Sequence, residues 1–247
     1  MKLPTQFDER VRPDIVKRAV LSIQSKNRQP YGADPEAGLR HVTRLNQRNN
    51  AFRGQKGKGM SRVPKKVLLA RGEQFYWVGA ESPNTRGGRT AHPPKAEKDF
   101  SEDINDKERR KAIRSAIAAT SDESLVSEKH DYEGDLPITS SDISSIEKTQ
   151  ELEEELEDLG LEDELERVSE KKVRAGKGAN RGRKYSRKTG PLVVVAEDDG
   201  IKQAASNLPG VDVSEVDQLN AEKLAPGAEP GRLTVWSEKS VEKLEEE

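Results

Sequence analysis

Apolar residues recur at helical spacing close to the start of the chain. Pro13 and Asp14 open this segment with a proline in the first turn and an acid near the positive end of the helix dipole. The apolar stripe that follows consists of Ile15, Val16, Ala19, Val20 and Ile23. This pattern predicts a helix over residues 13–26, ended by the Gln-Pro-Tyr-Gly run at 29–32.

A second helical pattern lies between residues 103 and 120. Asn105 and Glu108 have the spacing of a capping box, which predicts a helix beginning at this point. Its apolar face comprises Ala112, Ile113, Ala116, Ile117 and Ala119, and its basic face comprises Lys107, Arg110, Lys111 and Arg114. The two faces predict an amphipathic helix with one side in a core.

Short apolar runs alternate with helical patterns in the second half of the chain. Strands are expected at residues 137–139, 191–196, 211–213 and 233–236, and the run at 191–196 has the continuous β-branched character of a buried parallel strand. Helices are expected at 152–159, at 201–206, after Asn220 and at the Glu-rich C-terminus. The alternation predicts an α/β fold, in which a single globular domain has a mostly parallel central sheet flanked by helices. Residues 1–39 and 99–247 are assigned to this domain.

No periodicity is present between residues 40 and 98. This stretch carries fourteen Lys and Arg but only three acids, a local charge of +11, whereas the whole chain has a formal net charge of −2. Such a segment is expected to form a long basic loop that is disordered alone and becomes ordered on a partner.

A second basic segment runs from residue 171 to 188 and has nine Lys and Arg with no acid. The surrounding sequence is acidic, with twelve acids against two bases between residues 145 and 170. Cations at this density repel one another until phosphate neutralises them, so the two basic islands predict a nucleic-acid partner.

The sequence argues against several other classes of function. With no Cys there are no disulfides or thiolate metal sites, and no apolar run is long enough to span a bilayer. The glycine pair Gly54 and Gly59 is followed by Met60 and Ser61 instead of the Lys-Ser/Thr of a phosphate loop, and Arg181 replaces the third glycine of a dinucleotide fingerprint. We therefore expect no enzyme activity, cofactor, bound metal, small-molecule substrate or membrane contact, and a soluble intracellular protein.

Aromatic residues in the basic segments allow two interpretations. Phe52, Phe75, Tyr76 and Trp77 lie in the long loop, where the run Phe75-Tyr76-Trp77 either forms a small local cluster at the loop tip or stacks on unpaired bases. Tyr185 stands among the cations of the second segment. No RNP or KH signature is present, so sequence-specific reading of a single strand is not expected.

Six stretches in register resemble the archaeal and eukaryotic form of the fourth protein of the large ribosomal subunit. The entry to the loop, residues 29–32 with 37–40, and its exit at 87–95 (GGRTAHPPK) carry part of this likeness. The other stretches are 105–120 (NDKERRKAIRSAIAAT), 174–185 (RAGKGANRGRKY), 207–211 (NLPGV), and 224–227 with 231–236 (LAPG and GRLTVW). The likeness covers nearly the whole chain.

The resemblance implies a structural protein of the large subunit whose globular domain binds ribosomal RNA while its long loop reaches the peptide exit tunnel. It also implies a cytoplasmic, ribosome-bound protein with neighbouring ribosomal proteins as partners and the nascent chain near the loop tip. The expected RNA-binding residues in the loop are Arg40, Arg44, Arg53, Lys56, Lys58, Arg62, Lys65, Lys66, Arg86, Arg89, His92, Lys95 and Lys98. Those in the second segment are Lys171, Lys172, Arg174, Lys177, Arg181, Arg183, Lys184, Tyr185, Arg187 and Lys188. The expected tunnel-proximal tip comprises Arg71, Gln74, Phe75, Tyr76 and Trp77.

Two features depart from the pattern of this family. Its archaeal members usually begin with a short strand before the Leu-Pro that stands here at Leu3 and Pro4, so one edge strand is expected to be missing. The stretch from Gly72 to Trp77 also differs from the expected tip. A free RNA-binding regulator or RNA chaperone that uses the same surfaces is the alternative function.

Overall fold

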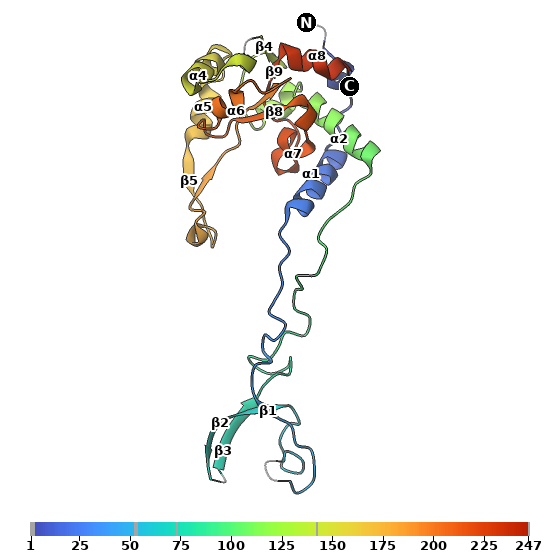
Figure 1. Ribbon diagram of the computed structural model, residues 1–247, viewed down its shortest axis with the longest axis vertical. Helices are drawn as coiled ribbons and strands as arrows, with labels where there is room; N and C mark the ends of the chain where they lie inside the picture. Colours follow the sequence, from blue (N-terminus) through green and yellow to red (C-terminus); the bar gives the residue numbers. More distant parts are fainter. Residues whose placement is uncertain (1–2, 52–53, 73, 142, 247) are drawn as a thin grey trace. The chain divides into compact units, whose positions relative to one another are not determined.

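The computed structural model describes residues 3–51, 54–72, 74–141 and 143–246 (Figure 1). The chain divides into two compact units. The first combines Met1–Asn27 with Ser101–Glu247, and the second is Arg28–Phe100. The division falls earlier in the sequence than the predicted loop boundary at residue 40.

A four-stranded parallel sheet forms the centre of the first unit. Its strands lie in the order β4 (Ile138–Ser140), β9 (Thr234–Ser237), β7 (Leu192–Val195) and β8 (Asp212–Glu215). In the register of the sheet, Val193 pairs with Val235 on β9 and with Val213 on β8. The sheet confirms the predicted α/β class and the predicted strand positions.

Alternate residues of β7 face two separate cores, because successive side chains of a strand point to opposite sides. Leu192 and Val194 pack with α1 (Pro13–Asn27), α2 (Asp106–Ala118), α7 (Ala221–Leu224) and α8 (Glu238–Glu246). Val193 and Val195 pack on the other face with α3 (Glu123–Ser127), α4 (Thr149–Asp158) and α6 (Ile201–Ala205). The unit therefore has three layers, helices on both faces of the sheet.

Short elements complete the first unit. Helix α5 (Glu162–Ser169), which the sequence does not predict, follows α4 after Gly160. The 3-10 turns are η1 (Thr5–Asp8), η2 (Ile143–Ser145), η3 (Ala179–Arg181), η4 (Val216–Gln218) and η5 (Pro226–Ala228). Phe7 of η1 meets Trp236 of β9 edge to face, with ring centroids 5.3 Å apart, so the N-terminal segment closes one core.

The first residues of α7 and α2 show whether the predicted N-cap hydrogen bonds form. The Asn220 side chain accepts a hydrogen bond from the Lys223 amide at 2.8 Å, as its position at the start of α7 predicts. Asn105 does stand at the N-cap position of α2, but its side chain makes no capping bond, so the predicted capping box is wrong. Glu108 instead pairs with Arg18 of α1 at 3.3 Å, because the two helices pack against each other.

The second unit contains an antiparallel sheet where no regular element is predicted. Strands β1 (Thr43–Arg44), β2 (Lys65–Arg71) and β3 (Gln74–Gly79) lie in that order. Between β2 and β3 the chain turns at Gly72, which has a φ of +52°. An irregularity between Val67 and Leu69 shifts the pairing of β2 with β3, and this shift breaks the alternation that would reveal the strand in the sequence.

The entry and exit segments of the second unit run backbone to backbone. The Ala33 amide donates to the Pro94 carbonyl at 2.9 Å. A Cβ on Gly32 would lie 2.4 Å from the Ala96 nitrogen, and one on Gly38 would lie 2.6 Å from the Arg89 Cα. Only glycine permits these approaches, which explains the glycines at 32 and 38 in the loop-entry stretch that carries part of the family resemblance.

Replacing Val194 with Ala should lower the free energy of unfolding by about 2 kcal/mol, because two fully buried methyl groups leave a cavity in the central strand. The matched control is Val173→Ala, since Val173 is 65% exposed and its loss should change stability by less than about 0.5 kcal/mol. Urea unfolding followed by circular dichroism measures both. Equal midpoints for the two variants would contradict the assignment of β7 to the core.

Candidate nucleic-acid interface

The second basic segment forms a hairpin. Strand β5 (Lys171–Val173) pairs antiparallel with β6 (Tyr185–Arg187), and η3 lies between them. The Arg174 amide extends the pairing with a bond to the Lys184 carbonyl at 2.7 Å. Gly176 and Gly182 have φ values of +88° and +82°, which the turn requires and which favour glycine. We call residues 171–188 the basic hairpin.

All nine Lys and Arg side chains of the basic hairpin are exposed. Within the described part of the chain, none of them lies within ion-pair distance of a carboxylate. The Tyr185 ring lies between two of these cations, with the Nζ atoms of Lys171 and Lys184 at 5.2 and 5.3 Å from its centroid. The hairpin thus presents uncompensated positive charge and one half-exposed ring to solvent.

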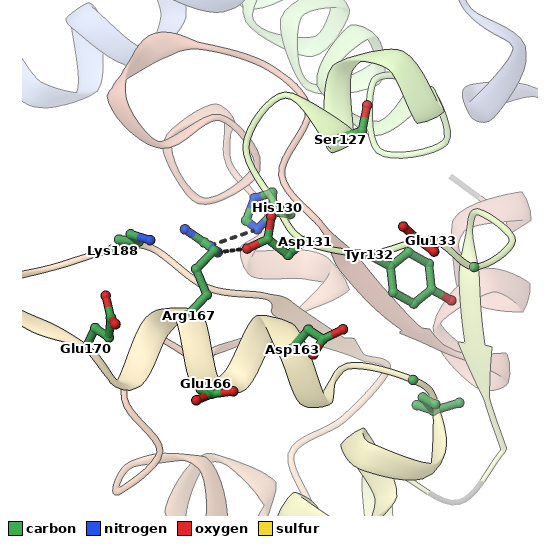
Figure 2. Close-up of a pocket in the computed structure, with 13 residues that line it drawn as sticks. Ser127, His130, Asp131, Tyr132, Glu133, Asp163, Glu166, Arg167, Glu170 and Lys188 are labelled. Carbon is green, nitrogen blue, oxygen red and sulfur yellow. Dashed lines mark hydrogen bonds and ion pairs between the residues drawn. The ribbon is translucent and has the colours of Figure 1, made fainter.

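A buried ion-pair network holds the C-terminal end of the basic hairpin. Arg167 of α5 donates from Nε and Nη2 to the two carboxylate oxygens of Glu164 at 2.6 Å each, and its Nη2 also donates to the Thr189 carbonyl at 2.9 Å. His130 Nδ1 lies 2.6 Å from Glu164 Oε1, and the Asp131 amide donates to Oε2 at 3.1 Å. Figure 2 shows Arg167 turned toward His130 and Asp131. The first residue after the hairpin is therefore tied to α5.

The Glu164 carboxylate is fully buried yet remains charged in this network. Burial by itself would raise its pKa, but the hydrogen bonds from Arg167 and His130 outweigh burial and hold the pKa below its ordinary value. A buried carboxylate with this many donors is a rigid point of attachment.

A second arginine, which is buried, holds the next residue, Gly190. Arg232, only 2% exposed, donates from Nε to the Gly190 carbonyl at 3.0 Å and from Nη2 to Asp212 Oδ2 at 2.6 Å. Burial lowers the pKa of Arg232, and the bond to Asp212 opposes this shift. A Cβ on Gly190 would lie 3.0 Å from the Gly210 carbonyl oxygen, so a side chain there would require the neighbouring backbone to shift.

The cations of the second unit differ in their availability. Ten of the predicted contact residues are exposed: Arg40, Arg44, Lys56, Lys58, Arg62, Arg86, Arg89, His92, Lys95 and Lys98. Lys66 is half-buried, with its Nζ 3.4 Å from His41 Nε2. Arg53 lies outside the described residues.

Two predicted contact residues are engaged within the protein. Lys65 is 8% exposed, donates to the Ser61 carbonyl and lies 5.6 Å from the centroid of the Trp77 ring. This differs from the surface position that the prediction requires, because the aliphatic stem of Lys65 packs in the small sheet. Arg40 is exposed but pairs with Asp34 and, at 3.6 Å, with Glu36. A phosphate would have to compete with both carboxylates there.

The predicted tip residues flank the turn between β2 and β3. Arg71, Gln74 and Tyr76 are exposed, and Tyr76 retains 67% of its accessible surface. Trp77 is half-buried against Lys65, on the opposite face of the strand from Tyr76. The side chain of Phe75 and all of Phe52 lie outside the described residues. Trp77 is therefore in contact with Lys65 within the small sheet, whereas the Tyr76 ring is exposed, and the stacking of these rings on bases stays a prediction.

The second unit contains an aromatic and cationic cluster of which only Lys98 is among the predicted site residues. The Tyr31 and Phe100 rings stack with an interplanar angle of 10° and centroids 5.5 Å apart. The Arg28 guanidinium lies 4.3 Å from the Phe100 centroid, and Lys98 Nζ lies 5.4 Å from it. Sixty-nine positions separate the two rings in the sequence, so no local pattern reveals the stack.

Two other site classes gain no support. No group of three or more His, Cys, Asp or Glu residues that could hold a metal occurs in the described ranges. Within the same ranges, no helix has both the length and the apolar character needed to cross a membrane.

Comparison with known proteins places this arrangement in a family. The family model described as "Ribosomal protein L4/L1 family" matches residues 1–247. The chain belongs to the ribosomal protein L4/L1 family. A relative named "Large ribosomal subunit protein uL4" from Nanoarchaeum equitans is 48% identical over 248 residues, covering 100% of this chain and 92% of the relative.

Two further archaeal relatives carry the same name. That of Halobacterium salinarum (strain ATCC 29341 / DSM 671 / R1) is 48% identical over an alignment of 249 positions, and the match covers 99% of this chain and 93% of the relative. That of Archaeoglobus fulgidus is 45% identical over an alignment of 249 positions, and the match covers 100% of this chain and 93% of the relative. The family confirms the predicted archaeal-type resemblance and the prediction that the chain is a ribosomal protein rather than an enzyme.

Replacing Glu164 with Gln should lower the free energy of unfolding at pH 7 by about 3–5 kcal/mol, because Arg167 loses its buried counter-charge. The depressed pKa of Glu164 stabilises the fold above the unfolded pKa of about 4.3, and this contribution is lost as the pH falls through the lower folded value. The difference between wild type and variant should therefore shrink below about pH 4.

Urea unfolding at a series of pH values measures this difference. Glu166→Gln on the same helix is the control, because Glu166 is exposed and should cost less than about 0.5 kcal/mol. A gap between wild type and Glu164→Gln that stays constant from pH 7 to pH 3 would show that the carboxylate charge does not hold the network.

Proposed function

We propose that this chain is a structural constituent of the large ribosomal subunit that binds large-subunit ribosomal RNA and has no chemistry of its own. The observation that carries the proposal is the basic hairpin, whose nine cations are exposed and unpaired by any described carboxylate. Such a surface gains free energy when phosphates displace their counterions onto it. The name of the chain's relatives, large ribosomal subunit protein, supports the choice of large-subunit ribosomal RNA as the polyanion.

The second unit is proposed to be the arm that enters the RNA. Its exposed cations lie along both of the long segments that lead to the small sheet, and its backbone contacts at Gly32 and Gly38 keep these segments together. In this proposal the turn after Arg71, with Gln74, Phe75, Tyr76 and Trp77, approaches the exit tunnel and the nascent chain. Neighbouring ribosomal proteins are the further partners, and the protein is cytoplasmic and ribosome-bound.

Affinity for a large-subunit RNA fragment should fall steeply with salt. If about ten phosphates are contacted, a plot of log affinity against log salt has a slope of roughly −7 to −9. Replacing Arg181 and Lys184 with Glu should weaken binding and make the slope shallower by about 1.5–2, because two phosphate contacts are lost. Filter binding at several potassium chloride concentrations measures both quantities.

The matched control replaces Lys17 and Lys239 with Glu. Both side chains are exposed on helices of the first unit, and the change in net charge is the same as in the Arg181 and Lys184 variant. We expect a much smaller loss of affinity and an unchanged slope for this control. Equal losses in the two variants would mean that only net charge matters and would reject the basic hairpin as an anchoring site.

Deleting residues 47–85 and bridging the gap with a short Gly-Ser linker should leave the first unit folded, because none of its core residues lies in the deleted segment. Circular dichroism should show near-native helix content, while incorporation into large subunits, followed by sedimentation after a high-salt wash, should be impaired. Loss of the helical signal would contradict the claim that the first unit folds without residues 47–85. Full incorporation would contradict the role of the arm.

A further inference from the structure

A hollow in the second unit lies beside the Tyr31 and Phe100 stack. Its volume is about 860 Å³, within the range of sites that bury small ligands. Tyr31, Phe100, Pro93 and Pro94 supply a flat apolar lining, and the lining also includes His92, Lys95 and Lys98. No carboxylate of the described residues contributes to it.

The two stacked rings beside this hollow leave part of their surface exposed. Tyr31 and Phe100 are nearly parallel, yet Tyr31 keeps 53% of its accessible surface. Arg28 lies above both rings, at 5.3 Å from the Tyr31 centroid and 4.3 Å from that of Phe100. The exposed surface of Tyr31 therefore lies beside an aromatic ring and a guanidinium group, a setting that favours the addition of one more planar group.

Holding the arm together does not require this exposed ring surface. The Ala33 to Pro94 hydrogen bond and the close approach of Gly32 to Ala96 already join the two segments through their backbones. A purely structural aromatic pair would be expected to bury its faces, whereas Tyr31 presents more than half of its surface to solvent.

We infer that this hollow receives an unpaired nucleobase of RNA, stacked on Tyr31 and Phe100, with the adjoining phosphate bound by Lys95 or Lys98. A nucleotide combines a planar π-face with an anionic group, and the lining offers a matching aromatic surface and cations. Both lysines are exposed, and the Lys98 backbone amide donates to the Lys95 carbonyl at 3.2 Å, so the two residues lie on one turn of the chain. This inference rests on the proposed binding of large-subunit RNA and adds a base-stacking site to it.

Substituting Tyr31 with Leu removes the ring but keeps apolar volume, and substituting it with Phe keeps the ring. For the full-length chain and a large-subunit RNA fragment, Tyr31→Leu should weaken binding about five- to a hundredfold, as expected for the loss of one stacked base. Tyr31→Phe should stay within about threefold of wild type. The salt slope of Tyr31→Leu should match that of wild type, because stacking neutralises no phosphate.

The double variant Lys95→Gln and Lys98→Gln should differ from Tyr31→Leu in its salt dependence. Its salt slope should become shallower by about 1–2, because phosphate contacts are lost. Leu68→Ala is the control for losing an exposed apolar side chain in the same unit, since Leu68 is 62% exposed, and its affinity should be unchanged. Ultraviolet crosslinking of the wild-type complex, read by mass spectrometry, should place a nucleotide adduct on the peptide that contains Tyr31 or Phe100. This last measurement does not depend on the folding of any variant.

The outcomes separate failure of this inference from failure of the proposed function. If wild type does not bind the RNA, the proposed function fails and the inference fails with it. If wild type binds with a steep salt slope but Tyr31→Leu binds equally well, or no adduct forms at either ring, only the stacking site is overturned. Unchanged RNA affinity with impaired incorporation of Tyr31→Leu into subunits would assign the hollow to a protein segment and would also overturn it.

Discussion

The like charges of the basic hairpin repel one another, and the hairpin therefore depends on its attachment to the rest of the first unit. The nine cations of the basic hairpin have no core beneath them, because nearly every residue from 171 to 189 is exposed. Their positions are instead set from one end, where Arg167 holds the Thr189 carbonyl and Arg232 holds the Gly190 carbonyl. Both arginines are neutralised by a carboxylate, so the attachment itself adds no further positive charge to the hairpin.

The acids around this attachment also influence how a polyanion can approach. The cavity beside Arg167 is lined by Asp131, Glu133, Asp163, Glu166 and Glu170, close to the last cation of the hairpin, Lys188. The negative potential of these carboxylates lowers the electrostatic free energy of the nearby cations and repels phosphate from this side. A chain with a net charge of only −2 therefore presents one strongly basic element beside an acidic surface, and a polyanion would meet attraction at the hairpin and repulsion beside it.

Local patterns in the sequence predict those elements whose stability is local or whose burial is complete. The helix at 13–26 and the strand at 191–196 are recognisable because each has an uninterrupted periodic or apolar run. The β2 and β3 hairpin is not recognisable, since an irregular register and lysines on a half-buried strand hide its alternation. The contact of Glu164 with His130 joins residues 34 positions apart, and the stack of Tyr31 on Phe100 joins residues 69 positions apart, so no local pattern encodes either of them.

The stretches that carry the family resemblance coincide with backbone contacts as much as with cations. Gly32 and Gly38 allow the two segments of the arm to meet, and a Cβ on Gly88 would lie 2.0 Å from the Ser82 carbonyl oxygen. In the first unit, a Cβ on Gly210 would lie 2.2 Å from Val168 Cγ1, directly beside the attachment of the basic hairpin. Phosphate binding tolerates the exchange of one exposed cation for another, because it depends mainly on charge, whereas a backbone approach of this kind tolerates only glycine. The glycines at these close approaches are therefore explained by the local geometry of the fold, and the exposed cations between them by the proposed binding of phosphate.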